Sequence, residues 1–192
     1  MTTGRLEAFT DAVIAIVITI LVLELRVPHE PELEALRGVV PIFLTYVLSF
    51  VYLGIYWNNH HHMMVLTERV NGKILWANLH LLFWLSLVPF TTAWMGENDF
   101  AEVPTALYGA DLLLAAIAYF ILQTAIIAEE GPDSRLRAAV GGDLKGKVSP
   151  LLYLAAIPLA FVSPWIALAL YVFVALIWLV PDRRIVRKVQ RG

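Results

Sequence analysis

The chain has 192 residues, of which 59% are hydrophobic and only 16% are charged, and its mean hydropathy is +0.72. A soluble domain is about half apolar and about a quarter charged, so this composition argues against a water-soluble enzyme or a nucleic-acid-binding protein and predicts a membrane protein. The net charge of −2 excludes no further class of protein, whereas the absence of cysteine excludes disulfides and thiolate metal sites.

Charged residues divide the sequence into apolar stretches, and one helical crossing of a bilayer takes about 20 residues. The last stretch, 148–181, is too long for one crossing, and Pro164 near its middle is typical of a helix break. We therefore predict an all-α integral membrane protein with six transmembrane helices in a single domain, 1–192. The predicted spans are 9–25, 40–59, 74–95, 104–128, 149–162 and 165–180.

Lysine and arginine are distributed unevenly between the two sides that six spans define. One side receives twelve of the 14 Lys and Arg residues, including those of the tail 183–191. The other side receives Arg26 and Arg37 together with a group of acidic residues, which are Glu30, Glu32, Glu34, Glu97, Asp99 and Glu102. Because positively charged loops stay in the cytoplasm, both termini are predicted to be cytoplasmic.

Asp11 and Asp111 lie within predicted spans, where an ionisable side chain is costly and usually faces protein or water. Asp11, near the start of the first span, is either a carboxylate favoured by the helix dipole or a buried group held by neighbouring spans. In the second case Asn78, the Trp76 indole or His80 can donate hydrogen bonds to it. Asp111 is either solvated in an outer vestibule or the partner of another helix, and the sequence leaves both interpretations open.

Three consecutive histidines, His60 to His62, follow the second predicted span. Consecutive residues on a helix point about 100° apart, so the three rings cannot all bind one ion. We therefore expect no metal site and no cofactor, and interpret the run as interfacial polar residues, one of which joins the polar groups around Asp11. The chain has no Ser-His-Asp or histidine-box constellation, so we do not expect an enzyme.

The first span opens on a motif that resembles the Arg-x-x-x-Phe-Ser-Asp signature of the lysosomal potassium channel family and its prokaryotic relatives. The motif residues are Arg5, Phe9, Thr10 and Asp11. The segment 78–96 is similar to the third helix of that family, and 57–60 is similar to the end of its second helix. The likeness covers most of the chain. Its one departure is Thr10 in place of serine, which keeps the hydroxyl group.

The resemblance implies a potassium channel in the plasma membrane of a prokaryote. Prokaryotic members have one six-span unit per chain and assemble as homotetramers whose first spans line a central pore. Animal members fuse two such units. Hydrophobic residues of the first span form the constriction in place of a carbonyl filter. Carried onto this chain, the residue five positions after Asp11, Ile16, is the narrowest point, with Thr19, Ile20 and Leu23 further outward.

The spacing of these four residues places them on one helix face, a pattern that any packed apolar stripe also shows. Three features favour a pore. The first span is short and bracketed by Asp11 and Glu24, Thr19 adds a hydroxyl to an apolar stripe, and the carbonyl-loop sequence Thr-Val-Gly-Tyr-Gly is absent from the chain. Without that loop, ion selectivity has to come from side chains and pore width.

We therefore predict a passive, K⁺-preferring cation channel in the lipid bilayer, with other monovalent cations as further permeant ions and no nucleic-acid partner. Glu24 and the glutamates after it would attract cations to the outer mouth. A structural network would hold the first span, and its predicted members are Arg5, Phe9, Thr10, Asp11, Trp76, Asn78 and His80. The alternative is a proton-coupled secondary transporter, although such proteins usually show an internal repeat that this chain lacks.

Overall fold

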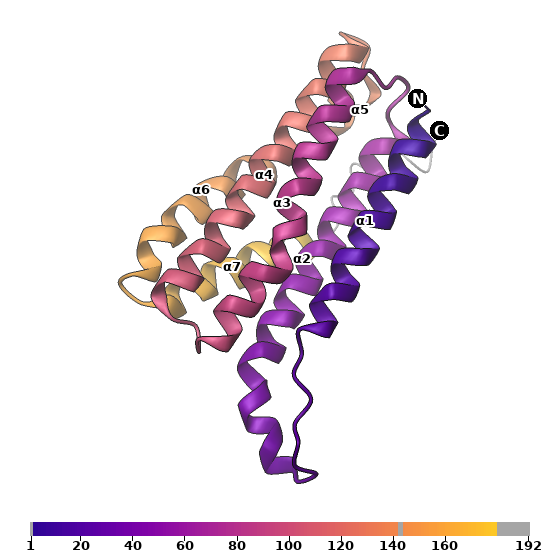
Figure 1. Cartoon of the computed structure of the whole chain (residues 1–192). Coiled ribbons are helices and arrows are strands. Elements are labelled where there is room, and N and C mark those ends of the chain that lie inside the picture. Colours follow the sequence, from indigo (N-terminus) through magenta and orange to yellow (C-terminus); the bar gives the residue numbers. More distant parts are fainter. Residues whose placement is uncertain (1, 142–143, 180–192) are drawn as a thin grey trace.

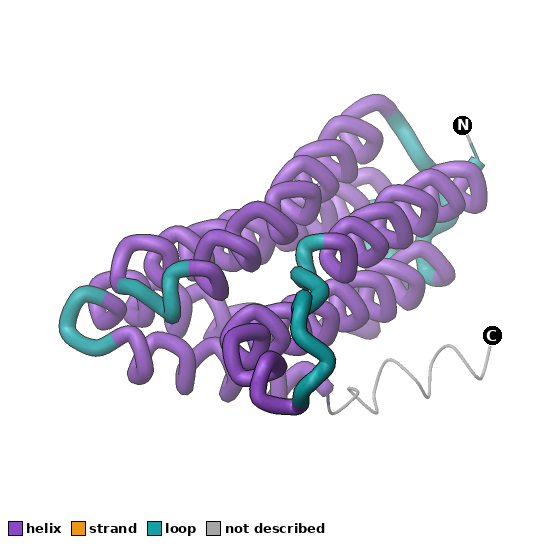
Figure 2. Tube along the Cα trace, turned by 60° about the horizontal axis from the view of Figure 1, so that its bottom comes forward, coloured by secondary structure: helices purple, strands orange, loops and turns teal. Residues whose placement is uncertain are grey.

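The computed structural model describes residues 2–141 and 144–179, and this part of the chain is a helical bundle without strands (Figure 2). The predicted basic tail and the position of the C-terminus lie outside these residues. The helices are α1 (Thr3–Leu23), η1 (Leu33–Val39), α2 (Val40–Val65), α3 (Gly72–Glu97), α4 (Glu102–Glu130), α5 (Arg135–Val140), α6 (Leu144–Ala160) and α7 (Pro164–Leu179).

Four helical segments are long and apolar enough to cross a membrane, namely α1, the continuous segment Leu33–Val65, α3 and α4. The last two helices are shorter, with 17 residues in α6 and 16 in α7. The all-α prediction is thus confirmed for the described residues, while the crossing of the membrane by α6 and α7 remains a prediction. Helices also run past the predicted spans, because polar residues that end an apolar stretch still continue the backbone hydrogen bonding of the helix.

Successive long helices run in opposite directions (Figure 1). The N-terminus, the connection 66–71 and α5 lie at one end of the bundle. The connections 24–32 and 98–101 lie towards the other end, where η1 and the first turns of α2 project beyond the neighbouring helices. The structure therefore separates the basic segments before residue 148 from the acidic segments, as the charge pattern of the sequence predicted.

The hairpin of α6 and α7 breaks where the sequence predicted a break. The α6 helix ends at Ala160, and the backbone N–H of Ser163 closes the turn on the carbonyl oxygen of Leu159 at 2.9 Å. Pro164 then opens α7, which suits proline because the first residues of a helix have no intrahelical acceptor for an N–H. A single proline thus turns one long apolar stretch into two antiparallel helices.

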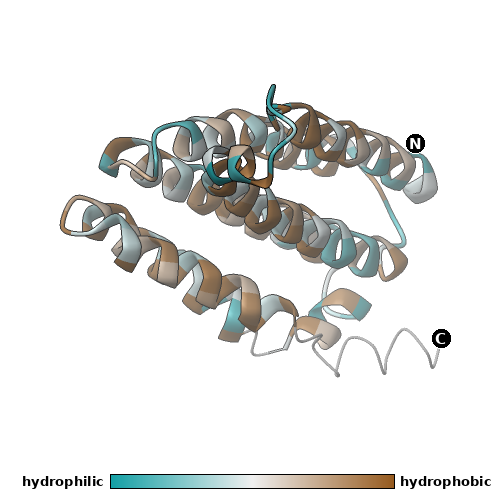
Figure 3. Ribbon diagram, turned by 90° about the horizontal axis from the view of Figure 1, so that it is seen from below, coloured by the Kyte–Doolittle hydropathy of each residue, from teal (hydrophilic) through white to brown (hydrophobic). Residues whose placement is uncertain are grey.

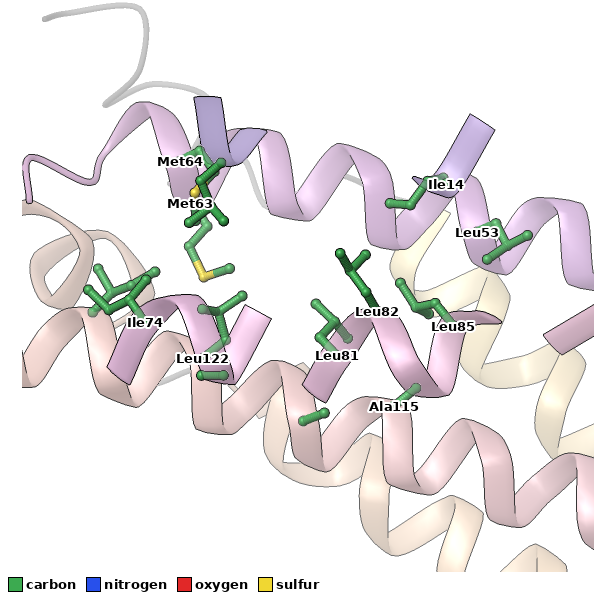
Figure 4. Close-up of a cluster of buried hydrophobic side chains, with 14 of the residues drawn as sticks. Ile14, Leu53, Met63, Met64, Ile74, Leu81, Leu82, Leu85, Ala115 and Leu122 are labelled. Atoms are coloured by element: carbon green, nitrogen blue, oxygen red, sulfur yellow. The ribbon is translucent and has the colours of Figure 1, made fainter. Parts of the chain in front are cut away.

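The hydrophobic core consists of two clusters. The larger cluster packs the helices α1, α2, α3 and α4 against one another and includes Ile14, Leu53, Leu81 and Leu122 (Figure 4). The smaller one joins α2 and α4 to the α6–α7 hairpin. Hydrophobic residues also cover the outer faces of the helices (Figure 3), and many large apolar side chains there are exposed. An apolar exterior of this kind requires lipid or a protein partner around it.

The side chain of Tyr171 in α7 packs directly against Gly109 of α4. A Cβ atom added there would lie 2.0 Å from the Tyr171 hydroxyl oxygen, which itself donates a hydrogen bond to the Thr105 carbonyl oxygen at 3.1 Å. The ring of Tyr171 fills the space beside Gly109 and is fully buried. Glycine is therefore required at this position by the packing of the α7 hairpin on α4.

We expect Gly109→Ala to lower the free energy of unfolding by about 1–3 kcal/mol, the usual cost of overpacking a core. The matched control is Gly54→Ala in α2, where an added Cβ would meet nothing within 4 Å. Because alanine restricts the unfolded chain more than glycine does, the control is expected to be neutral or slightly stabilising. Denaturant titration of both variants in detergent measures the difference, and equal stabilities would contradict the contact.

Candidate functional site

The candidate site is the exposed face of α1, together with the contacts that hold the helix from behind. The buried face repeats at intervals of three and four residues and consists of Leu6, Thr10, Ile14, Val17 and Leu21. The opposite face carries the four residues predicted to line a pore. Ile16 is 60% exposed and Leu23 is 74% exposed, and Thr19 and Ile20 are exposed between them. The predicted pore stripe therefore points away from the core of its own chain.

Thr19 carries the only hydroxyl group on α1 after Asp11. Its Oγ1 donates a hydrogen bond to the Ala15 carbonyl oxygen at 2.8 Å, one turn back along the helix. The hydrogen of the hydroxyl is thus directed at the backbone, and the lone pairs of its oxygen remain available on the exposed face. This arrangement can accept a hydrogen bond from water or coordinate a cation.

Two carboxylates hold α1 against the antiparallel helix α2. The Trp57 indole Nε1–H donates to Asp11 Oδ1 at 3.0 Å, and His61 Nδ1 donates to Glu7 Oε1 at 2.6 Å. Glu7 and Asp11 are four residues apart, as are Trp57 and His61, so both contacts recur after one turn on each helix. These two contacts fix the rotation of α1 about its own axis and hence the direction in which Ile16 points.

A buried contact joins α1 to α3 as well. Asn78 Nδ2 donates to Thr10 Oγ1 at 2.9 Å, and Asn78 Oδ1 accepts from His60 Nε2 at 2.9 Å. All three side chains are buried, and His60 Nδ1 has no hydrogen-bond partner in the described chain. Because the three side chains are buried, each of these groups depends on the others for hydrogen bonding. The two hydrogen bonds through Asn78 therefore link α1, α2 and α3.

Three residues of the predicted network, Thr10, Asp11 and Asn78, make contacts between helices, but not the contacts that were expected. Asn78 donates its hydrogen bond to Thr10, and Asp11 accepts a hydrogen bond from Trp57. The prediction that Asn78, Trp76 or His80 donates to Asp11 is therefore wrong. Trp76 is 75% exposed, and His80 Nε2 accepts a hydrogen bond from Trp84 at 2.9 Å. The reason is geometric: residues two apart on a helix point about 200° away from each other, so residues 76 and 80 cannot share the direction of Asn78.

Sequence reasoning missed Glu7, Trp57 and His61 as members of this network. A signal for them was present in the sequence. Two acids lie four residues apart on one helix, and two hydrogen-bond donors lie four residues apart on the next, antiparallel helix. One histidine of the run does join the polar group, as predicted, since His60 contacts Asn78 beside Thr10. Arg5 and Phe9 are exposed at the same end of α1.

Asp111 lies in a helix contact, which decides between the two interpretations of it. It is buried in α4, and its Oδ2 accepts a hydrogen bond from Thr91 Oγ1 of α3 at 3.0 Å. Its Oδ1 has no partner in the part of the chain that the structure describes. Asp111 is therefore a partner of another helix within this chain, and it lies in a different part of the bundle from the contacts of Asp11.

The acidic loop after α1 is only partly neutralised. Arg26 pairs with Glu97 and Arg37 pairs with Glu34, at 2.5 and 2.8 Å respectively. Glu24, at the C-terminal end of α1, has no ion pair within residues 2–141 and 144–179. The C-terminal end of the exposed α1 face is thus close to unpaired negative charge. Across the described residues, no group of three or more His, Cys, Asp or Glu side chains is placed to hold a metal ion.

Comparison with known proteins identifies relatives of the whole chain. Residues 5–89 match the family model described as endosomal/lysosomal potassium channel TMEM175. A protein of Chryseobacterium sp. (strain P1-3) that is named a potassium channel is 52% identical over the full length of both chains. A bovine protein named endosomal/lysosomal proton channel TMEM175 is 28% identical, and the match covers 72% of this chain and 32% of the bovine one.

The fold matches a solved structure of the same kind. The crystal structure of a lysosomal potassium-selective channel TMEM175 homolog from Chamaesiphon minutus superposes with a TM-score of 0.78 at 31% sequence identity. The superposition covers 92% of this chain and 95% of that one. The resemblance inferred from the Arg5-to-Asp11 motif is thereby confirmed. The apolar exterior of the helices and the family of these relatives together indicate an integral membrane protein. The chain belongs to the TMEM175 potassium channel family.

Proposed function

We propose that this chain is one subunit of a homotetrameric, K⁺-preferring passive cation channel, and that the exposed face of α1 lines its pore. The observation that carries the proposal is the asymmetry of α1. One face is locked to α2 and α3 by polar contacts, and the other face presents Ile16, Thr19, Ile20 and Leu23 outside the subunit. The names of the bacterial relatives support K⁺ as the permeant ion.

The polar contacts behind α1 are more than a lipid-facing helix needs. Helices that face lipid are held by apolar packing, and intramembrane polar groups are kept where function needs them. Here Asp11, Glu7 and Thr10 all lie on α1 and all find partners on neighbouring helices. A helix that must present one defined stripe to a central axis requires this kind of rotational control.

Ion passage through such a pore follows from the side chains along the stripe. Unpaired glutamates near the outer mouth raise the local cation concentration by focusing the electric field. A fourfold ring of Ile16 side chains then forms a narrow apolar constriction that loses its water and opposes hydrated ions. The Thr19 oxygens, one turn outward, replace part of the water around the ion. K⁺ sheds water more easily than Na⁺, so this barrier favours K⁺.

The test is ion flux through the purified chain in liposomes. Vesicles loaded with K⁺ and suspended in an impermeant cation at the same pH are expected to release K⁺ when a permeant anion, thiocyanate, carries the compensating charge. Matched Na⁺-loaded vesicles are expected to release Na⁺ more slowly. A pH-sensitive dye inside the vesicles reports proton movement in the same experiment. K⁺ release that requires a pH gradient would instead identify a proton-coupled transporter, and proton flux without K⁺ flux would contradict the choice of ion.

A further inference from the structure

Asp111 is an ionisable residue inside a predicted span, and the proposed pore does not use it. It is only 4% exposed, and its contact joins α3 to α4 rather than involving α1. Ionisable side chains are costly in a membrane and are kept there where they bind a proton, an ion or another side chain. The partners of the Asp111 carboxyl group therefore indicate which of these it binds.

The carboxyl group has a single hydrogen-bonding partner. Thr91 Oγ1 lies 3.0 Å from Asp111 Oδ2, while Oδ1 has no partner among the described residues. The Thr91 hydroxyl has one hydrogen, and the Val88 carbonyl oxygen, at 3.2 Å, competes for it. The neighbouring hydroxyl groups hydrogen-bond to one another instead, and belong to Ser49, Thr92 and Tyr108. An ionised carboxylate would thus be buried here with at most one donor, which is strongly unfavourable.

No positive charge compensates for the missing donors. None of the ion pairs within residues 2–141 and 144–179 includes Asp111, and α4 contains no basic residue. The titratable side chains that surround this part of α4 are phenols, from Tyr56, Tyr108, Tyr153 and Tyr171. The basic side chains of α2, α3 and α6 lie towards the opposite end of the bundle, and are those of residues 60–62, Lys73, His80, Lys145 and Lys147.

A proton on Asp111 suits this arrangement. A carboxylic acid protonated on Oδ2 donates its hydrogen to Thr91 Oγ1, and the Thr91 hydroxyl then donates to the Val88 carbonyl oxygen. Only a neutral carbonyl oxygen, Oδ1, is left without a partner, which costs far less than an unpaired charge. We propose that Asp111 is a proton-binding site, un-ionised in the folded protein, and that its ionisation breaks the contact between α3 and α4. The proposal does not depend on ion conduction, so it is tested without current.

Proton binding makes the stability of the protein depend on pH. The folded protein holds this proton over a pH range in which the unfolded chain, whose carboxyl groups are in water, has released it. Raising the pH through this range favours the unfolded state, by up to about tenfold in the equilibrium constant per pH unit for one proton. Denaturant titrations of the full-length chain in detergent are expected to show a larger loss of stability for the wild type than for Asp111→Asn, which cannot ionise. Glu102→Gln, which changes an exposed carboxyl group of the same helix, is the matched control and should lose as much as the wild type.

Infrared spectroscopy detects the proton directly, because a carboxylic acid has a C=O stretching band that an ionised carboxylate lacks. The spectra are recorded in an ester-free detergent at about pH 7, where exposed carboxyl groups are ionised. The wild type and Glu102→Gln are expected to show the band, and Asp111→Asn is expected to lose it. If Asp111→Asn does not fold, Thr91→Val assigns the band, because an acid that loses its hydrogen-bond acceptor absorbs at higher wavenumber.

Three results would overturn the proposal. The first is a wild type without the acid band, together with a pH dependence of stability equal to that of Asp111→Asn. The second is a band that Asp111→Asn retains or that Thr91→Val leaves unshifted, because the proton would then belong to another carboxyl group. The third is a band that appears only when Na⁺ and K⁺ are replaced by a large organic cation, which would show that the Asp111 carboxylate binds a metal cation instead.

Discussion

Ile16→Asn is expected to raise single-channel K⁺ conductance about tenfold and to bring the K⁺-to-Na⁺ permeability ratio close to one. In the proposed tetramer, four Ile16 side chains form the apolar ring that water leaves and that ions must cross. An asparagine ring keeps water in the constriction, and a barrier lowered by about 1.4 kcal/mol corresponds to a tenfold faster passage. Planar bilayer recordings with K⁺ on one side and Na⁺ on the other measure both quantities.

The matched control is Ile117→Asn in α4. Ile117 is also an exposed isoleucine on a long apolar helix, but it lies on the outside of the bundle and far along the chain from α1. The same substitution there should leave conductance and selectivity unchanged. If Ile16→Asn channels conduct and select as the wild type does, Ile16 does not lie at a constriction, and the pore has to be placed on another surface.

Asn78→Leu is expected to abolish current and to destabilise the assembled protein. Leucine has a similar volume but offers no hydrogen bond, so the Thr10 hydroxyl and His60 Nε2 both lose their buried partner. Leaving a buried polar group unpaired costs about 1–3 kcal/mol, and two such groups are affected here. Helix α1 would then lose its attachment to α3. Denaturant unfolding in detergent measures stability, and light scattering shows whether four copies of the 21.5 kDa chain remain associated.

Asn58→Leu provides the comparison for this second experiment. Asn58 lies on α2 two residues before His60, but its side chain is exposed. The same change of side chain should therefore alter neither unfolding nor current. A stable, fully conducting Asn78→Leu tetramer would show that the buried contact is dispensable, and the orientation of α1 would have to depend on Trp57 and His61 alone.

The sequence was sufficient to predict the helical class, the break at Pro164 and the separation of basic from acidic ends, because each depends on local composition or on one residue type. It was not sufficient to predict which polar residues meet. Asp11 contacts Trp57 only because α1 and α2 pack at one particular register, and hydrophobic periodicity does not specify the register between two helices. The structure also has two short helices, η1 and α5, in segments that the sequence predicted to be loops between spans.

The candidate pore stripe came from the family resemblance, and the helical spacing of its residues was only consistent with it. Ile16 and Leu23 share a face with Thr19 at helical spacing, and the sequence alone showed that much. Which face of α1 turns to the core was not visible, because both faces are apolar and both repeat at three and four residues. Thr10, a buried hydroxyl in the middle of the other stripe, is the residue that distinguishes the two faces once its partner Asn78 is known.

The buried contact between Thr10 and Asn78 also sets the height of α1 along its own axis. The two carboxylate contacts repeat every four residues, so a slide of α1 by one turn would still place an acid opposite an indole or an imidazole. The same slide would bring Leu6 or Ile14, both buried and apolar, against the Asn78 amide. One hydroxyl group in an apolar stripe thus fixes a unique vertical position, and with it the level in the bilayer at which the four Ile16 side chains would meet.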